Sequence, residues 1–182
     1  MKELSLNVLD ISENSVKAKA TLVEIRLTDK ADSLTISITD NGTGMTDETR
    51  RSVTDPFYTT RTTRKVGLGI PLFKEAAEQT GGRLTITSRH VSEFPDSHGT
   101  TVTAFFNKNH IDFAPLGDIV STLVTLIQGH PTTDFLFIHE MDGGTVSLDT
   151  RQLREILEDV PLDNFEVLTW ISENLKEQYS LV

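Results

Sequence analysis

The sequence contains no cysteine, which excludes disulfide bonds and thiolate metal sites. It also lacks an uninterrupted apolar run of about 18 residues, the length that a membrane-spanning helix requires. The N-terminal residues alternate charged and polar side chains with leucines and do not form the apolar segment of a signal peptide. These absences predict a cytoplasmic protein that has no membrane partner.

Positive charge is also scarce, since 17 Lys and Arg residues stand against 27 Asp and Glu residues, for a net charge of −10. A nucleic-acid-binding protein needs a basic surface to neutralise phosphates, so we expect no nucleic-acid partner. The cations that are present are unevenly spread, because Arg61, Arg64 and Lys65 fall close together. This cluster indicates a site for a bound polyphosphate, and a solvated basic loop is the alternative.

The chain of 182 residues is long enough for one sizeable core, or for one domain of about 100–130 residues with an appendage. A hydrophobic content of 37% and a charged content of 24% are typical of a globular protein. The polar segment 107–110 marks a boundary. We therefore predict a domain over residues 1–108 and a small C-terminal α/β extension over residues 109–182.

Residues 3–18 predict a helix, because apolar side chains recur at helical spacing and neither Pro nor Gly interrupts them. On this helix Asp10 and Asn14 are four residues apart and therefore lie on one face. An acid and an amide beside apolar neighbours need polar partners if they are buried. A magnesium ion and a water would supply those partners, and a helix edge facing solvent is the alternative.

A glycine-rich turn follows the second of two predicted strands, 21–27 and 34–40. Residues 34–39 alternate apolar and polar side chains, so they predict a half-buried strand that ends at Asp40. Gly42 and Gly44 allow the backbone to turn sharply and to approach a flat ligand closely. A short helix over residues 46–51 comes next, with Thr46 as its N-cap.

A second glycine-rich turn, Gly67-Leu68-Gly69, begins a helix predicted over residues 68–79. Free amides and the helix dipole at such an N-terminus favour phosphate. Either glycine turn taken alone is better explained as an ordinary tight loop. Strands over 83–89 and 99–106 complete the order of elements, which predicts an α+β fold, a two-layer α/β sandwich with a mixed sheet and helices on one face.

The C-terminal extension predicts a helix over 115–128, a hairpin of strands over 134–139 and 145–148, and helices over 150–159 and 164–179. About 70 residues is small for an independent domain, so we expect the extension to pack on the preceding sheet or on another copy of the chain. Its apolar stripe is equally well explained as a partner surface. A protein partner or a homodimer through this region is therefore expected.

Several motifs in order resemble those of a Bergerat-fold (GHKL) ATPase domain. This histidine-kinase-like group is shared by DNA gyrase, the large heat-shock chaperones, sensor histidine kinases and the MutL mismatch-repair proteins. Residues 9–20 are similar to the N-box helix of the group, residues 40–44 to its adenine-binding glycine box, and residues 55–60 to the box before its ATP lid. Residues 67–69 resemble the second glycine box, and residues 99–100 the final one.

The resemblance implies ATP and Mg²⁺ as cofactors. Asp40 would accept a hydrogen bond from the adenine amine, with Thr100 supporting it through a water. Asn14 would be the metal ligand, because its amide oxygen suits a hard ion that also takes phosphate oxygens. The resemblance places the remaining cofactor contacts at Gly42, Gly44, Met45, Phe57, Arg61, Arg64, Lys65, Gly67, Leu68 and Gly69.

Asp10 and Lys65 are the candidate catalytic residues that the resemblance implies. Hydrolases and anti-sigma serine kinases of the group carry a glutamate four residues before the metal-binding asparagine, whereas many sensor kinases carry an amide there. Asp10 holds this position, so slow Mg-dependent ATP hydrolysis with Asp10 as base is the leading hypothesis. The alternatives are an anti-sigma-type kinase that phosphorylates a serine on a protein partner, and a non-catalytic ATP-gated binding module.

Overall fold

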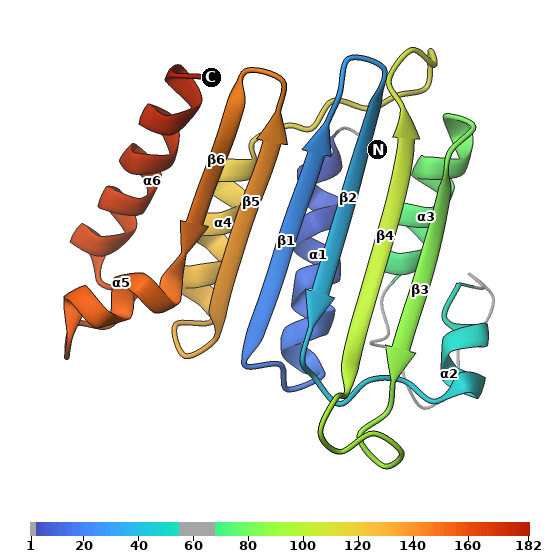
Figure 1. Cartoon of the computed structure of the whole chain (residues 1–182), viewed down its shortest axis with the longest axis horizontal. Helices are drawn as coiled ribbons and strands as arrows, with labels where there is room; N and C mark the ends of the chain where they lie inside the picture. Colours follow the sequence, from blue (N-terminus) through green and yellow to red (C-terminus); the bar gives the residue numbers. More distant parts are fainter. Residues whose placement is uncertain (1–2, 55–67) are drawn as a thin grey trace.

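The computed structural model describes residues 3–54 and 68–182 (Figure 1). Its elements in chain order are α1 (Leu4–Lys17), β1 (Leu22–Asp29), β2 (Ser33–Asp40), α2 (Asp47–Ser52), α3 (Gly69–Gln79), β3 (Arg83–Arg89), β4 (Gly99–Asn107), α4 (Ile119–Gly129), β5 (Asp134–Met141), β6 (Gly144–Asp149), α5 (Thr150–Leu157) and α6 (Phe165–Ser180). None of the helices in these residues combines the length and the apolarity needed to cross a bilayer.

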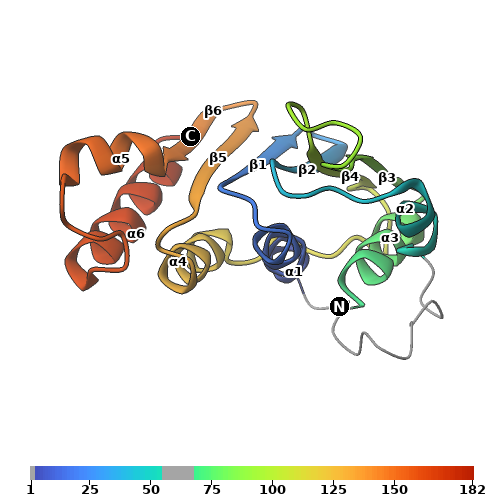
Figure 2. The same cartoon turned by 90° about the horizontal axis from the view of Figure 1, so that it is seen from below.

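The described strands form one sheet in the order β3-β4-β2-β1-β5-β6. The pairing of β1 with β5 is parallel and the other pairings are antiparallel, so the sheet is mixed. Helices α1, α3 and α4 lie side by side against one face of the sheet (Figure 2). The structure therefore confirms the predicted α+β fold with helices on one face of a mixed sheet.

The core lies between this sheet face and the three helices. Alternate residues of the central strands, such as Ile25 on β1 and Ile38 on β2, point toward the helices and are buried. On α1 the residues Leu4, Val8 and Ile11 form the stripe that faces them. Each such side chain contributes about 1.5–3 kcal/mol on burial, so this packing fixes α1 against the end of β2.

The extension continues the same sheet beyond residue 108. Strand β5 pairs with β1 from Leu22↔Asp134 to Thr28↔Glu140, and β6 pairs with β5. Helix α4 lies beside α1, where the hydroxyl of Thr122 donates to the carbonyl of Ser5 at 3.5 Å. The segment 109–182 therefore adds strands to the edge of the sheet that the first half of the chain builds.

The predicted start of the helix at Pro115 was wrong, because α4 begins at Ile119 with Asp118 as its N-cap. The side chain of Asp118 accepts a hydrogen bond from the amide of Ser121 at 2.9 Å. The carbonyls of Pro115 and Leu116 instead accept hydrogen bonds from the first amides of α1, at 2.9 and 2.8 Å. Those amides have no acceptor within their own helix, so the segment before α4 caps α1.

Candidate functional site

Asp40 ends β2 with a side chain that is nearly enclosed, at 9% exposure. The hydroxyl of Ser15 donates to Oδ2 at 2.6 Å, and the amide of Gly42 donates to Oδ1 at 2.9 Å. A carboxylate oxygen accepts about two hydrogen bonds, so each oxygen retains capacity for a ligand donor. The carboxylate is therefore a fixed acceptor whose orientation is set by α1 and by the following turn.

The turn after Asp40 is clamped between the end of α1 and the connection from β3 to β4. The amide of Thr43 donates to the carbonyl of Ala18, and the carbonyl of Thr43 accepts from the amide of Val91, both at 2.8 Å. Gly44 has a φ of +71°, and any Cβ there would collide with the carbonyl of Arg89. The neighbouring backbone alone therefore requires glycine at position 44, with or without a bound ligand.

A cavity of about 290 Å³ lies between α1 and the sheet beside this turn. It combines apolar walls with a few polar groups, among them the buried carboxylate of Asp40. Its lining residues are Ile11, Asn14, Ser15, Lys17, Ala18, Asp40, Gly44, Met45, Thr49, Val53, Ile70, Thr100 and Val102. A flat heterocycle with an amino group suits such a cavity, because the walls take its faces and the carboxylate takes its donor.

Thr100 lies opposite Asp40 in the pairing of β2 with β4 and lines the same cavity. Its hydroxyl shares a hydrogen bond of 2.7 Å with the hydroxyl of Ser88, which also accepts from the amide of Met45 at 2.7 Å. The structure therefore brings Asp40, Thr100 and Met45 together in the lining of one cavity. It adds Ser88 as the residue that joins two of them.

The first turn of α3 lies directly against the middle of α1. A methyl group added at Gly69 would come within 3.3 Å of Cβ of Asp10 and 3.8 Å of Nδ2 of Asn14. The amides of Gly69 and Ile70 belong to the first turn, which has no acceptors within the helix and carries the positive end of the helix dipole. The N-terminus of α3, whose amides suit an anion, therefore lies next to Asp10 and Asn14.

The pKa of Asp10 is raised above its ordinary value of 3.8, chiefly because partial burial removes water from the carboxylate. The charge of Lys17 lowers this pKa and that of Glu13 raises it further. A carboxylate with a raised pKa is a stronger base than one in free solution. The environment of Asp10 is therefore compatible with the role that the sequence predicted for it.

Ser15, like Ser88, is a site residue that sequence reasoning missed. A signal for it was present, because Ser15 extends the buried stripe of Leu4, Val8 and Ile11 at helical spacing. A hydroxyl at such a position needs a buried hydrogen-bond partner. The end of the adjacent strand supplies that partner at Asp40.

Part of the predicted site lies outside the described residues. This part comprises Phe57, Arg61, Arg64, Lys65 and Gly67. Leu68 is the N-cap residue of α3 and is 56% exposed. The roles assigned to these residues, to Gly42 and to Asn14 as metal ligand stay predictions. Within the part of the chain that the structure describes, no three His, Asp or Glu side chains are grouped as a metal site.

A family model described as histidine kinase-, DNA gyrase B-, and HSP90-like ATPase matches residues 2–110. The chain belongs to this family of ATPases. The match covers every segment from which the resemblance was drawn, and it shows that this histidine-kinase-like ATPase contains a GHKL ATP-binding domain. No curated protein sequence matches the chain.

Many solved structures share the fold of this ATPase family member, and two of them serve as examples. The Aquifex aeolicus MutL ATPase domain complexed with ADP is 16% identical with a TM-score of 0.56, over 87% of this chain and 70% of that one. The N-terminal domain of a DNA repair protein is 17% identical with a TM-score of 0.53, over 81% of this chain. The alignment spans 51% of that second domain, or about half of its length. At these identities the likeness concerns the fold alone.

Proposed function

We propose that this protein binds Mg-ATP in the cavity beside Asp40 and hydrolyses it slowly. The observation that carries the proposal is the buried carboxylate of Asp40, held by Ser15 and Gly42 and facing an apolar cavity of about 290 Å³. The similar MutL domain is complexed with ADP, which supports an adenine nucleotide as the ligand.

Adenine recognition rests on Asp40 and on the cavity walls. The adenine amine donates to a carboxylate oxygen of Asp40 that has capacity left beyond its two protein donors. The linked hydroxyls of Thr100 and Ser88 support the base through a water. Guanine presents a carbonyl at the position of the amine, and two acceptors facing each other repel, so ATP is preferred to GTP.

The phosphates lie toward the first turn of α3. The backbone amides of residues 67–69 donate to phosphate oxygens, and the positive end of the helix dipole favours their charge. The basic residues Arg61, Arg64 and Lys65 are the proposed neutralising cations, and among them Lys65 is the candidate to offset charge on the γ-phosphoryl group.

The donors at the site fit magnesium. Asn14 offers an amide oxygen, the hard neutral ligand that this ion accepts, and it lies beside the amides proposed to hold the phosphates. Asn14 would hold the ion together with phosphate oxygens and waters. When bound, magnesium offsets the negative charge that develops on the phosphates.

Asp10 is proposed to orient the attacking water and to take its proton. The water oxygen forms a bond to the γ-phosphorus, the bond from phosphorus to the bridging oxygen breaks, and ADP leaves. Because aspartate is one methylene shorter than glutamate, Asp10 acts directly or through a second water. The raised pKa of Asp10 favours proton acceptance.

The test is one incubation with γ-labelled Mg-ATP that follows free phosphate and protein-bound label together, with Asp10→Asn beside the wild type. We expect phosphate release by the wild type and its loss in the variant, with nucleotide binding retained in both. Equal release by the two proteins would contradict the role of Asp10. Binding with neither release nor label would contradict hydrolysis.

A second candidate is an ATP-gated module that binds a protein partner or a second copy of the chain. It is favoured by a groove of about 360 Å³ beside the β5–β6 hairpin, where Ile156 is 79% exposed and Trp170 is 50% exposed. An exposed tryptophan beside a groove is typical of protein interfaces. This candidate predicts ATP-dependent complex formation that Trp170→Ala abolishes and Asp10→Asn leaves unchanged.

Transfer of phosphate to a serine of that partner, as in an anti-sigma-type kinase, is the remaining alternative. The same groove would hold the substrate protein, and Asp10 would take the proton of the serine hydroxyl. Label in the γ-phosphate incubation would then appear on the added partner and not as free phosphate.

A further inference from the structure

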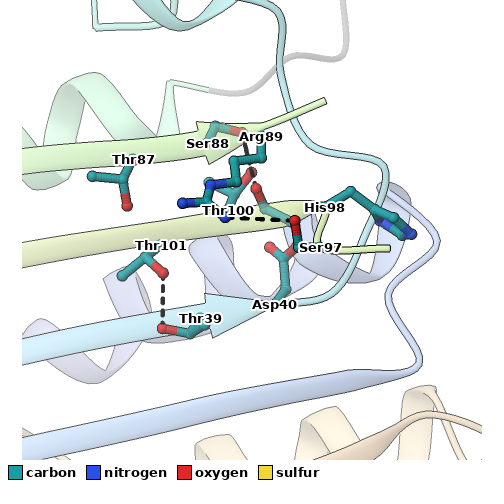
Figure 3. Close-up of a pocket in the computed structure, with 10 residues that line it drawn as sticks. Thr39, Asp40, Thr87, Ser88, Arg89, Ser97, His98, Thr100 and Thr101 are labelled. Atoms are coloured by element: carbon teal, nitrogen blue, oxygen red, sulfur yellow. Dashed lines mark hydrogen bonds between the residues drawn. The ribbon is translucent and has the colours of Figure 1, made fainter. Parts of the chain in front are cut away.

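A second cavity, of about 490 Å³, opens at the same end of the sheet (Figure 3). Its lining residues come from the ends of β2, β3 and β4 and from the connection between β3 and β4. They are Thr39, Asp40, Thr87, Ser88, Arg89, Ser97, His98, Gly99, Thr100 and Thr101. Nearly all of them carry a polar side chain, unlike the lining of the cavity proposed for ATP.

The floor of this second cavity is made of threonine hydroxyls. Thr39 and Thr101 share a hydrogen bond of 3.1 Å across β2 and β4, and Thr87 lies on the neighbouring strand β3. Successive side chains of a strand point to opposite faces, and Ile38 and Val102 are buried under the helices. The hydroxyls therefore lie on the sheet face opposite α1 and α3.

Arg89 forms one wall and is held in place before any ligand arrives. Its guanidinium lies over the ring of Phe94, 5.4 Å from the centroid, and Nη1 donates to the hydroxyl of Ser97 at 3.5 Å. In Figure 3 its side chain extends in the direction of Thr87 and Thr101. A cation fixed by its neighbours loses less entropy on binding than a free one.

The lining of this cavity has a formal charge of zero with histidine neutral, +1 from Arg89 and −1 from Asp40, although the chain as a whole is acidic. The net charge of the protein is −10, yet Arg89 supplies a permanent positive charge here. Asp40 is the one carboxylate among the described lining residues, and both its oxygens already accept hydrogen bonds from Ser15 and Gly42. The acids Glu93 and Asp96 of the connecting loop are not among the lining residues that the structure describes.

We propose that this cavity binds a small oxyanion, a carboxylate or a phosphate. The planar guanidinium of Arg89 pairs with two oxygens of such a group. The hydroxyl of Thr87 and one of the paired hydroxyls of Thr39 and Thr101 donate to the others, because the second hydroxyl of that pair donates to the first. The proposed oxyanion contacts differ from the contacts of the ATP cavity, since the hydroxyls of Thr39, Thr87 and Thr101 lie on the other face of the sheet. The two cavities share Asp40 and Thr100 in their linings.

The test is an NMR titration of the full chain, labelled with ¹⁵N, with inorganic phosphate and separately with malonate. We expect saturable shifts of the amides of Thr39, Arg89 and Thr101 with at least one probe. Arg89→Gln should weaken that binding at least tenfold. Arg83→Gln is the matched control, because Arg83 lies on the same strand and face and stacks on Phe105 at 5.3 Å but does not line the cavity.

The position of the shifts separates this site from the proposed nucleotide site. Shifts of Gly69 and Ile70 without shifts of Thr39 and Thr101 would place phosphate at α3 and overturn the proposal. Equal weakening in Arg83→Gln and Arg89→Gln would overturn it too. Binding of phosphate alone or of malonate alone would support the site and identify the group that it takes. Because no nucleotide is added, failure of ATP binding would not affect the result.

Thr101→Val provides a second variant in case Arg89→Gln does not fold. It removes one hydroxyl from the floor and keeps the branched shape that suits a strand. The amide spectrum of the variant shows whether it is folded. We expect weaker binding of the same probe, and unchanged affinity in a folded Thr101→Val and a folded Arg89→Gln would overturn the proposal.

Discussion

Ser15 donates its hydroxyl to Asp40 over a distance of 2.6 Å, across 25 residues of sequence. This hydrogen bond joins the first helix to the end of the second strand. The bond fixes the orientation of the Asp40 carboxylate, and so the direction from which a ligand can donate a hydrogen bond to it. The selectivity of the proposed site therefore depends on a residue that touches the acceptor and not only on the acceptor itself.

We predict that Ser15→Ala weakens ATP binding roughly tenfold, because a hydrogen bond to a charged group contributes about 1.5 kcal/mol or more. Ser12→Ala is the matched control. Ser12 is buried on the same helix, and its hydroxyl has no partner in the described part of the chain. Calorimetric titration of both variants checks the prediction, and equal affinities of the two variants would contradict it.

We predict that Asn14→Ala removes the magnesium dependence of ATP binding more than it removes binding itself. The amide oxygen is the proposed protein ligand of the ion, while Asp40 and the walls hold the base without it. Affinities with magnesium and with a chelator, measured for both proteins, give the answer. An equal loss of affinity in the two conditions would count against a metal ligand at Asn14.

Gly44 and Gly81 form a matched pair for testing the glycine turn. Both have positive φ angles, +71° and +76°. A Cβ at Gly44 would meet the carbonyl of Arg89, whereas a Cβ at Gly81 would have no described atom within 4 Å apart from its adjoining residues. We predict a loss of about 1 kcal/mol in unfolding free energy for Gly81→Ala, from backbone strain alone.

For Gly44→Ala we predict a loss of about 3 kcal/mol or more, because a clash with fixed backbone adds to the strain. Urea denaturation of the two variants measures both losses. Similar losses of unfolding free energy in Gly44→Ala and Gly81→Ala would contradict the prediction, because they would mean that the turn at Gly44 can shift to avoid the clash.

His139 links the C-terminal helix α6 to the end of the sheet that is opposite the proposed ATP site. Its side chain is almost fully buried, and Nδ1 lies 2.7 Å from the hydroxyl of Tyr179. Nε2 lies 3.7 Å from a carboxylate oxygen of Asp29, which is also paired with Lys108. Burial lowers the pKa of His139 below its ordinary value of 6.5, although Asp29 opposes this shift and Lys108 adds to it.

This lowered pKa predicts a pH dependence of stability. Below pH 6.5 the unfolded chain protonates this residue while the folded chain does not, so the unfolded state binds more protons. The free energy of unfolding should therefore fall as the pH drops from 6.5 toward the lower pKa of the folded state. His139→Gln should flatten that fall in denaturation curves measured from about pH 7 to about pH 5. Parallel curves for wild type and variant would refute this role of His139.

The fold was predictable because its signals are local. Residues 34–39 alternate strictly and lead to Asp40, and the strand β2 is found over Ser33–Asp40. Thr46 caps α2 by accepting from the amide of Thr49, as a threonine before a polar helix predicts. Gly81 follows α3 with a positive φ, as a helix end requires.

What escaped prediction depends on contacts between distant segments. Pro115 continues the apolar pattern of α4, yet its carbonyl accepts a hydrogen bond from the amide of Leu4 and so caps α1. The partner of Ser15 lies on another element, so periodicity shows that the hydroxyl needs an acceptor but not which one. Likewise, the cluster of Thr39, Thr87 and Thr101 arises only when β2, β3 and β4 pair in register.

The most direct test of the central claim is a calorimetric titration of ATP into wild type and Asp40→Asn. The variant keeps the size of the side chain but presents an amide, which matches the adenine amine poorly. We predict binding by the wild type, weaker binding of GTP, and no measurable binding of ATP by Asp40→Asn. Normal ATP affinity in a folded Asp40→Asn would contradict the assignment of this cavity as the nucleotide site.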